Sequence, residues 1–442
     1  FLNRRSFLEK GQEMLARAHE NHETVIVMMF DLDHFKAIND IHGHAMGDHV
    51  LRETANRISE MRLGDAMVAR LGGDEFAYAC CIPASAIHRI EDEARKLVDA
   101  IIQPIIKNGV EMTVTTSLGI ARSDRHGGDI DTLLRRADIA MYAAKKSGRN
   151  RHNWFDEGME YELHRRSAME SGMRAGIAAS EFIPYYEQQV DLTTGKLLGF
   201  EMLARWESPT LGLVSPEHFI PIAEETGMIG DLSFAVMRKA FVDARHWDSM
   251  LTLSVNISPF QLKDPWFSHK LLKLLTETGF PANRLEIEIT ETALYDNVEL
   301  AQTIIASLKN QGIRVALDDF GTGYSSLANL RALPFDRIKI DRSFVMAMDK
   351  NPESATIVQA IARLGESLGL PVTAEGIETG DIENQLRTLG LANGQGWHFG
   401  RPMTVEQATQ LLSHMRRPAQ PTDETKRGDS NIPAYRQMGG AV

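Results

Sequence analysis

Cysteine is scarce in this chain of 442 residues. The two cysteines, Cys80 and Cys81, are adjacent, so the sequence has no disulfide framework, and we expect this portion to lie in the reducing cytoplasm. Long hydrophobic runs are also missing, because the strongest apolar run of the N-terminal part, Val25–Phe30, is far too short to span a membrane. No signal peptide is visible. The chain opens on Phe1, and we expect it to be part of a longer protein, in which any membrane attachment would belong to a missing N-terminal region.

Positive charge is in deficit. The 60 acidic residues outnumber the 48 basic residues, which gives a formal net charge of −12. A chain this acidic binds polyanions poorly, so we exclude long DNA or RNA as a partner. A small phosphorylated ligand stays open, because a metal ion reverses the local electric field. The apolar and charged fractions, 43% and 24%, are those of a globular protein and exclude fibrous or wholly disordered classes.

The predicted strands and helices divide the chain into two parts that differ in the order of these elements. In residues 1–155 the apolar runs Met67–Leu71 and Glu75–Cys81 flank Gly72-Gly73, which predicts a hairpin with a two-residue glycine turn. We expect this part to be a ferredoxin-like α/β domain. Residues 156–180 are predicted to form a connecting helix. Residues 417–442 are rich in proline, glycine and polar residues, which predicts a disordered tail.

Short apolar strands alternate with helical stretches in residues 181–416. This alternation predicts a TIM-like parallel (β/α) barrel, again of the α/β class. The expected strands are 197–204, 251–257, 285–289, 315–317, 337–340 and 372–374.

Polar side chains mark the ends of these predicted strands. Catalytic groups of such barrels gather at the C-terminal strand ends. Carboxylates crowded there repel one another unless hard divalent cations bind between them, and two such ions about 4 Å apart suit attack of water on a phosphodiester. Salt bridges and helix caps are the alternative explanation for any single acid. The candidate residues are Glu201, Asn256, Glu288, Asp318, Asp319, Lys339 and Glu375.

The second part resembles the EAL-domain cyclic-di-GMP phosphodiesterases. Residues 199–206 read GFEMLARW, close to the opening motif of that family. Further motifs follow in family order: SVNIS at 254–258, EITE at 288–291, DDFGTGYSSL at 318–327, KID at 339–341, AEGIE at 374–378 and QG at 395–396. The resemblance implies hydrolysis of cyclic-di-GMP to linear pGpG.

The resemblance also implies a role for each motif residue. Two Mg²⁺ or Mn²⁺ ions are implied, one of them held by Glu201, Asn256, Glu288 and Asp318. Asp318 is implied to bridge to the second ion, with Asp319 beside it. Glu375 and Gln395 would complete the site, and Lys339 would orient the attacking water. Arg205 is implied to contact a substrate phosphate, and Glu291 to hold the loop 319–326 in place.

The first part resembles the GGDEF diguanylate cyclases. DLDHFK at 31–36, ND at 39–40, GH at 43–44 and GD at 47–48 have the family's spacing, and RLGGDEF at 70–76 reproduces its central motif. The resemblance implies a nucleotidyl-cyclase-like fold, GTP as substrate and one or two Mg²⁺ or Mn²⁺ ions. Two such domains must face each other to join two GTP molecules, so a homodimer is implied. By resemblance, Asp31 and either Glu75 or Asp74 bind metal, and Asp74 lies near the reacting hydroxyl. Asn39 and Asp48 are implied to read guanine, and Lys36, Lys145 and Arg149 to bind phosphates.

Two departures from the EAL pattern stand out. Met202 replaces the usual alanine, and strand alternation places it on the face opposite Glu201, so we expect a change of packing without loss of a ligand. Glu187 and Gln188 stand where many relatives have Gln-Pro, at the expected edge of the ligand mouth.

Two other functions stay open. The first domain could bind GTP to regulate the barrel, or the whole chain could be a non-catalytic nucleotide receptor that signals through the linker helix.

Overall fold

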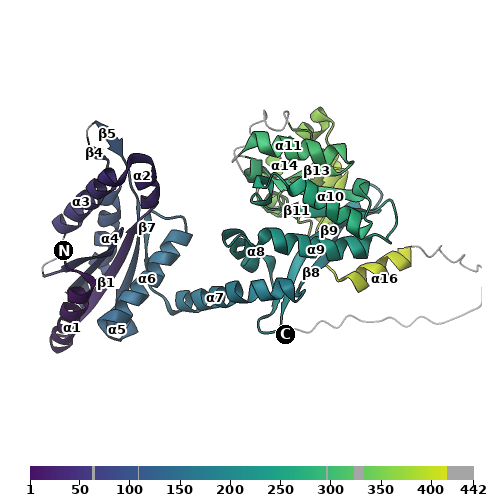
Figure 1. Cartoon of the computed structure of the whole chain (residues 1–442). Helices are drawn as coiled ribbons and strands as arrows, with labels where there is room; N and C mark the ends of the chain where they lie inside the picture. Colours follow the sequence, from purple (N-terminus) through teal and green to yellow (C-terminus); the bar gives the residue numbers. More distant parts are fainter. Residues whose placement is uncertain (62–64, 108, 295–296, 323–332, 416–442) are drawn as a thin grey trace, which may run out of the picture. The chain divides into compact units, whose positions relative to one another are not determined.

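The computed structural model describes residues 1–61, 65–107, 109–294, 297–322 and 333–415 (Figure 1). The chain forms two compact units, Phe1–Ala168 and Met169–Val442. The predicted disordered tail, residues 417–442, lies outside the described residues. Within the described ranges, no helix is both long enough and apolar enough to cross a membrane.

The first unit is built around one five-stranded sheet. The strand order is β2-β3-β1-β6-β7, and all neighbours are antiparallel except the edge pair β6 and β7. In chain order the elements are α1 (Arg4–Glu20), β1 (Glu23–Leu32), α2 (Phe35–His42), α3 (His44–Glu60), β2 (Met67–Gly72), β3 (Glu75–Pro83), the 3₁₀ turn η1 (Ala84–Ala86), α4 (Ile87–Ile101), β4 (Ile105–Lys107), β5 (Val110–Met112), β6 (Thr116–Arg122), α5 (Ser123–His126), α6 (Ile130–Lys146) and β7 (Arg151–Trp154).

Helices cover both faces of this sheet (Figure 1). Alternate residues of β1 supply the two cores, as the period of a strand requires. Val25 and Val27 pack with α1 and α6 on one face, whereas Ile26 and Met28 pack with α3 and α4 on the other. The central strand is therefore apolar from Val25 to Phe30, and the carboxylate of Asp31 follows near its C-terminal end.

The predicted hairpin is present, but its turn lies one residue further along than we expected. Gly72 belongs to β2 and pairs with Glu75, so the turn residues are Gly73 and Asp74 instead of the two glycines. Gly73 has a φ of 47°, a left-handed conformation that glycine adopts without a steric cost. A register shift between Arg70 and Gly72 explains the difference, because one extra residue is accommodated before the turn.

Helix α7 (Glu157–Ala178) spans the division between the units. Its Met159 and Leu163 pack against the core of the first unit, and its Met169 and Met173 are buried in the core of the second. The remaining elements are β8 (Phe182–Asp191), β9 (Leu197–Ser208), β10 (Gly212–Val214), α8 (Pro216–Glu225), α9 (Ile229–Ala244), β11 (Thr252–Ile257), η2 (Gln261–Lys263), α10 (Phe267–Thr278), η3 (Ala282–Arg284), β12 (Leu285–Thr290), η4 (Glu291–Leu294), α11 (Val298–Asn310), β13 (Arg314–Phe320), β14 (Arg337–Ile340), α13 (Arg342–Ala347), α14 (Pro352–Leu368), β15 (Val372–Ala374), α15 (Gly380–Thr388), β16 (Asn393–Gln395) and α16 (Val405–Met415).

The second unit is a closed barrel of eight strands. Strands β9 and β11 to β16 run parallel in chain order, and β8 closes the ring by pairing with both β16 and β9. Both pairings of β8 are antiparallel, so the expectation of a wholly parallel barrel was wrong in this one strand. Neither β8 nor β16 carries a clear strand signal in its residues. Pro184 interrupts β8 and the three consecutive polar residues Glu187, Gln188 and Gln189 break any alternation in it, while β16 has only 3 residues.

Strand alternation separates the packing face of the barrel from its interior. Leu253 and Val255 of β11 are fully buried within the main core, whereas Ser254 of the same strand points to polar groups of neighbouring strands. Met202 is buried in the apolar core, next to residues of α8 and α9. The expectation that Met202 packs away from Glu201 is thus confirmed.

Candidate active site

Three neighbouring strands bring the first group of predicted ligands together at the C-terminal end of the barrel. Asn256 of β11 lies directly beside Glu288 of β12, and its amide nitrogen donates to Glu201 Oε1 of β9 at 2.5 Å. Glu201 and Glu288 are buried, with 5% and 1% of their surface exposed. With its nitrogen held by Glu201, the amide of Asn256 keeps its oxygen available as an acceptor.

Asp318 and Asp319 reach the same site although they are consecutive in a strand. Regular pleating would send their side chains to opposite faces. A register shift between Leu317 and Phe320 interrupts the pairing of β13 with β14, and Asp319 has a left-handed backbone with a φ of 54°. This local distortion lets both carboxylates approach Glu375, and such distortion in a residue other than glycine is typical of functional sites.

Lys339 of β14 is fully buried among four carboxylates. Its ammonium nitrogen lies 2.5 Å from Glu375 Oε1 and 2.7 Å from Glu288 Oε2. Glu201 Oε2 and Asp318 Oδ1 are further away, at 3.5 and 3.7 Å. One positive charge facing four negative groups leaves the cluster short of positive charge, so it favours additional cations.

The electrostatics of the cluster follow from this imbalance. Burial and the neighbouring Glu201 raise the pKa of Glu288 well above its ordinary value. Burial and Asp318 likewise raise the pKa of Asp319 to about 6. Burial alone would lower the pKa of Lys339, but the surrounding carboxylates raise it well above its ordinary value, so this lysine remains an ammonium.

The donor set fits a hard divalent cation. Among the described residues one group has ligand atoms that all lie within 4.8 Å of one another, and it consists of Asp318, Asp319 and Glu375. Glu201 and Glu288 lie alongside, but their oxygens accept hydrogen bonds from Asn256, Gln395 and Lys339. Oxygen-only ligands of this kind select Mg²⁺ or Mn²⁺ over softer metals.

The other predicted residues of the barrel lie around this cluster. Gln395 is buried and donates to Glu201 Oε2. Arg205 is half-buried on the inner face of β9, with its guanidinium 5.3 Å from the ring centroid of Tyr185. Glu291 is buried at the start of η4, directly after β12. The loop that Glu291 was predicted to hold is described only as far as residue 322, so this role remains a prediction.

The first unit also places its predicted acidic residues close together. Asp31 of β1 lies opposite Glu75 of β3, and Lys145 pairs with Asp31 Oδ1 at 2.8 Å. Helix α6 begins after its N-cap Asp129, whose side chain accepts from Thr132, and its last turn delivers Lys145 to this edge of the sheet. Burial raises the pKa of Asp31, and burial with Asp138 of α6 raises that of Glu75.

Asp33, the second acid of the DLDHFK segment, has a structural role. It is buried, and its carboxylate accepts from the hydroxyls of Thr115 and Ser117 at 2.8 Å each and from the backbone N–H of Asn150 at 3.2 Å. These bonds fix the loop before β6 and the loop before β7. Asp33 therefore differs from Asp31, which stays partly accessible beside the hairpin.

Besides Lys145 of α6, the predicted nucleotide-binding residues of this unit lie on α2, α3 and the loop after α6. Lys36 and Asp48 are exposed, and Asn39 packs so closely on Gly47 that a Cβ there would lie 2.0 Å from its Oδ1. Arg149 is exposed in a left-handed conformation just after Gly148. Asp31, Asp74 and Glu75 do not form a three-carboxylate ligand group within the described residues, so ligand oxygens would have to complete a metal site there.

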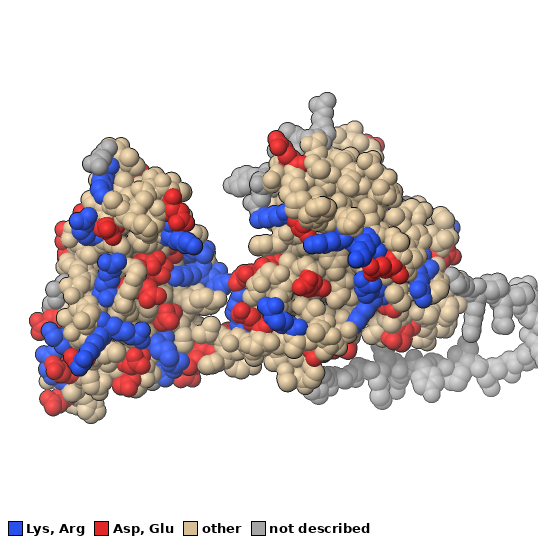
Figure 2. Space-filling view, viewed as in Figure 1, with Lys and Arg blue, Asp and Glu red and all other residues tan. Residues whose placement is uncertain are grey.

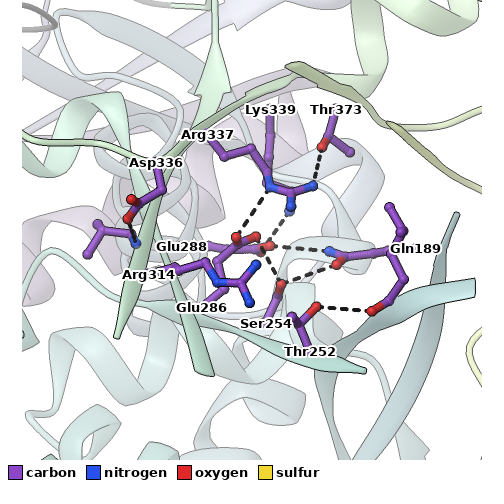
Figure 3. A network of polar contacts seen from close by, with 12 residues as sticks. Gln189, Thr252, Ser254, Glu286, Glu288, Arg314, Asp336, Arg337, Lys339 and Thr373 are labelled. Carbon is purple, nitrogen blue, oxygen red and sulfur yellow. Dashed lines mark hydrogen bonds and ion pairs between the residues drawn. The ribbon is translucent and has the colours of Figure 1, made fainter. Parts of the chain in front are cut away.

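Sequence reasoning missed several buried polar residues inside the barrel (Figure 3). Gln189 of β8 is 2% exposed and contacts Ser254, Glu288 and Gln395. Below them Glu286 and Arg337 form an ion pair at 3.2 Å. Glu187, expected at the edge of the mouth, is instead buried directly opposite Glu201. These residues were missed because β8 was not predicted as a strand, and the residues that point into a barrel can be assigned only once their strand is recognised.

Comparison with known families agrees with this geometry. A family model of the EAL domain matches residues 170–402, and a model described as diguanylate cyclase, GGDEF domain, matches residues 1–151. An uncharacterized signaling protein of Caulobacter vibrioides is 39% identical over 92% of this chain and 50% of its own length. The bifunctional diguanylate cyclase/cyclic di-GMP phosphodiesterase MucR of Pseudomonas aeruginosa is 34% identical over 92% of this chain and 59% of its own length.

A solved structure resembles the barrel. The PaMucR phosphodiesterase in complex with c-di-GMP is 33% identical over 55% of this chain and 99% of its own, with a TM-score of 0.53. The fold and the acidic strand ends thus define a barrel of the type that generally depends on divalent metals. The chain belongs to the EAL family, with a GGDEF domain preceding the EAL domain, and the resemblance inferred from the motifs is confirmed. The chain spans about half the length of the first curated relatives that it matches.

Proposed function

We propose that this protein turns over cyclic-di-GMP, with the EAL barrel hydrolysing it to linear pGpG. The observation that carries the proposal is the convergence of Asp318, Asp319 and Glu375 within 4.8 Å, beside the buried Lys339. Asp318, Asp319 and Glu375, with Glu201, Asn256 and Glu288 alongside, would hold Mg²⁺ or Mn²⁺. When bound, such a cation lowers the pKa of water and neutralises developing phosphate charge.

The chain's own residues would position the reactants. The Lys339 ammonium lies in the cluster as a hydrogen-bond donor, and we propose that it orients the attacking water. Arg205, on the inner face of β9 above Glu201, would contact a non-bridging phosphate oxygen, because a guanidinium presents a planar set of donors. Gln395 would keep Glu201 in place by its hydrogen bond.

We propose a second activity for the first unit, formation of cyclic-di-GMP from GTP in a homodimer located in the cytoplasm. Its support is the Asp74 turn beside the Asp31–Glu75 pair, with Lys145 at 2.8 Å from Asp31. Regulation of the barrel by GTP is the alternative role for this unit. That alternative requires GTP to change the rate of pGpG formation or the affinity for cyclic-di-GMP.

One assay with two matched variants tests these assignments. The chain is incubated with cyclic-di-GMP or with GTP, each with Mn²⁺, and the nucleotides are separated by chromatography. Asp319→Asn should lower pGpG formation by about 100-fold, whereas Asp74→Asn should leave it unchanged. With GTP, cyclic-di-GMP should accumulate in Asp319→Asn and be absent in a variant that also carries Asp74→Asn. Binding of cyclic-di-GMP without any pGpG would instead favour the receptor.

The charge distribution gives no support to a nuclease acting on long nucleic acids. On the face shown in Figure 2, Lys and Arg are interspersed with Asp and Glu on each unit, without a continuous basic stripe. Together with the net charge of −12, this agrees with a small anionic substrate bound through local positive groups.

A further inference from the structure

Gln189 lies inside the barrel, one layer below the carboxylate cluster. It belongs to β8, where it pairs with Gly199 of β9 on one side and with Gln395 of β16 on the other. It shares the inner face of β8 with Glu187, two residues earlier, and is 2% exposed. Figure 3 shows its amide directed toward Glu288 and Ser254.

The hydrogen bonds of Gln189 have a defined direction. The Ser254 hydroxyl lies 3.3 Å from Gln189 Oε1 and donates to it, since a carbonyl oxygen only accepts. The amide nitrogen of Gln189 then donates to Gln395 Oε1 at 3.2 Å, and it also lies 3.5 Å from Glu288 Oε1. The oxygen of Gln395 is thereby engaged, so its nitrogen is the end that faces Glu201.

A layer of buried polar residues lies below Gln189 and supports this chain of hydrogen bonds. The single Ser254 hydroxyl proton is shared between Gln189 Oε1 and Glu286 Oε1, since both oxygens only accept and both lie 3.3 Å from the hydroxyl, and Glu286 pairs with Arg337 at 3.2 Å. Arg337 in turn donates to the Thr373 hydroxyl at 3.0 Å. These residues come from β11, β12, β14 and β15, so the layer joins four strands of the barrel (Figure 3). It gives Ser254 a fixed place from which to orient Gln189.

We propose that Gln189 is a positioning residue for the divalent-cation site, acting through Gln395 and Glu288. This inference rests on the proposed function of the barrel. Within the described residues no hydrogen bond joins Gln189 to Asp318 or Asp319, so it would act on the cations only through the two residues that it orients. Residues that hold metal ligands in this way contribute about 10- to 100-fold to metal affinity.

The neighbouring glutamine provides a matched control. Gln188 is on the opposite face of β8, and its amide donates to the Phe399 carbonyl at 2.8 Å, away from the cluster. Both glutamines are buried, at 8% and 2% exposure, and lie in the same strand. A general weakening of β8 would therefore affect both positions, whereas loss of ligand orientation would affect only Gln189.

Calorimetric titration with Mn²⁺ alone tests the proposal. All proteins carry Asp31→Asn so that the acids of the first unit do not contribute. Gln189→Met, which is close in size but cannot donate, should weaken Mn²⁺ binding by about tenfold, and Gln188→Met by less than about twofold. In the hydrolysis assay, excess Mn²⁺ should restore kcat of Gln189→Met, with KM for cyclic-di-GMP unchanged.

The possible results separate this inference from the proposed function. Equal Mn²⁺ affinity of Gln189→Met and the parent protein would overturn the role of Gln189 and leave hydrolysis untouched. If Gln189→Met binds Mn²⁺ tenfold more weakly than the parent protein, but the parent forms no pGpG, the positioning role of Gln189 would be supported and the proposed hydrolysis overturned. If Gln189→Met does not fold, Gln189→Glu replaces it. That variant keeps the size but exchanges the donor for an acceptor, so it should also lower kcat at limiting Mn²⁺, and an unchanged kcat there would contradict the proposal.

Discussion

Glu187 of β8 and Glu201 of β9 lie directly opposite each other on antiparallel strands inside the barrel. Both are buried, so two carboxylates share one layer in a region of low polarity. Like charges at opposed positions destabilise a sheet pair, and here burial adds the cost of desolvation. Burial and Glu201 together raise the pKa of Glu187 to about 7.

The opposed pair of carboxylates predicts that the metal-free protein loses stability as the pH rises. The pKa of Glu187 is about 7 in the folded protein and near the ordinary glutamate value of 4.5 in the unfolded chain, so the folded state binds the proton more tightly. Stability from Glu187 is therefore complete below about pH 4.5 and is lost as the pH rises through 7. Glu187→Gln should then be more stable than the parent by about 1–3 kcal/mol at pH 8, with little difference at pH 4.5.

Urea unfolding in EDTA at a series of pH values measures this difference. The quantity to compare is the change in free energy of unfolding between Glu187→Gln and the parent, because other groups titrate in both. A constant difference across pH 4.5 to 8 would show that Glu187 does not titrate in this range.

Lys339 should be the residue on which the metal-free barrel most depends. Its replacement by methionine leaves Glu201, Glu288, Asp318 and Glu375 without their shared counter-ion. Removing one partner of a buried ion pair costs about 3–5 kcal/mol, and we expect Lys339→Met to cost that much at pH 8 in EDTA. Mn²⁺ should restore more stability to the variant than it adds to the parent.

The control for Lys339 is Lys309, which pairs with Asp336 in a partly exposed position. Lys309→Met should cost less than about 1 kcal/mol, as is usual for ion pairs near the surface. Denaturant unfolding followed by tryptophan fluorescence compares the two variants. Similar costs for both would contradict the central role given to Lys339.

Much of the candidate site could be predicted from sequence because parallel barrel strands place their last residues at one end. Glu201, Asn256, Glu288 and Lys339 were placed correctly in the same mouth by this rule. The rule fails for β8, because an antiparallel strand brings residues to the mouth from the other direction. For this reason Gln189 was missed, and Glu187 was assigned to the edge only from its match to the Gln-Pro position of relatives.

The local geometry at Asp319 could not be predicted either. Alternation along a regular strand would separate Asp318 from Asp319, and only the interrupted pairing of β13 with β14 and the left-handed backbone bring both to Glu375. In the first unit the apolar runs predicted the hairpin, but the bulge after Arg70 moved the turn to Gly73 and Asp74. Such shifts depend on tertiary pairing, which the pattern of one strand does not contain.

The packing role of Met202 can be separated from the chemistry of Glu201. Met202 is 5% exposed and packs near α8 and α9, so Met202→Ala should lower the free energy of unfolding by about 2–5 kcal/mol. Its side chain is on the face opposite Glu201, so Mn²⁺ affinity should stay within about twofold. Met250→Ala is the control, because Met250 is 83% exposed and its loss should change neither quantity. A marked loss of Mn²⁺ affinity in Met202→Ala alone would mean that the helix-facing side of β9 also shapes the metal site.

Gly119 is expected to be the most sensitive glycine of the first unit. A Cβ at this position of β6 would lie 1.9 Å from the Ala137 carbonyl oxygen and 2.2 Å from the Met141 nitrogen, both in the backbone of α6. Because backbone cannot move aside as a flexible side chain can, Gly119→Ala should push α6 off the sheet and cost about 3 kcal/mol or more.

Gly72→Ala is the control, since a Cβ there meets no atom within 4 Å. Hydrogen exchange of the β1 and β6 amides reports on this unit separately, and it should accelerate in Gly119→Ala and remain unchanged in Gly72→Ala. The displacement of α6 would also carry Lys145 away from Asp31, so GTP-dependent activity should fall in Gly119→Ala while pGpG formation by the barrel persists.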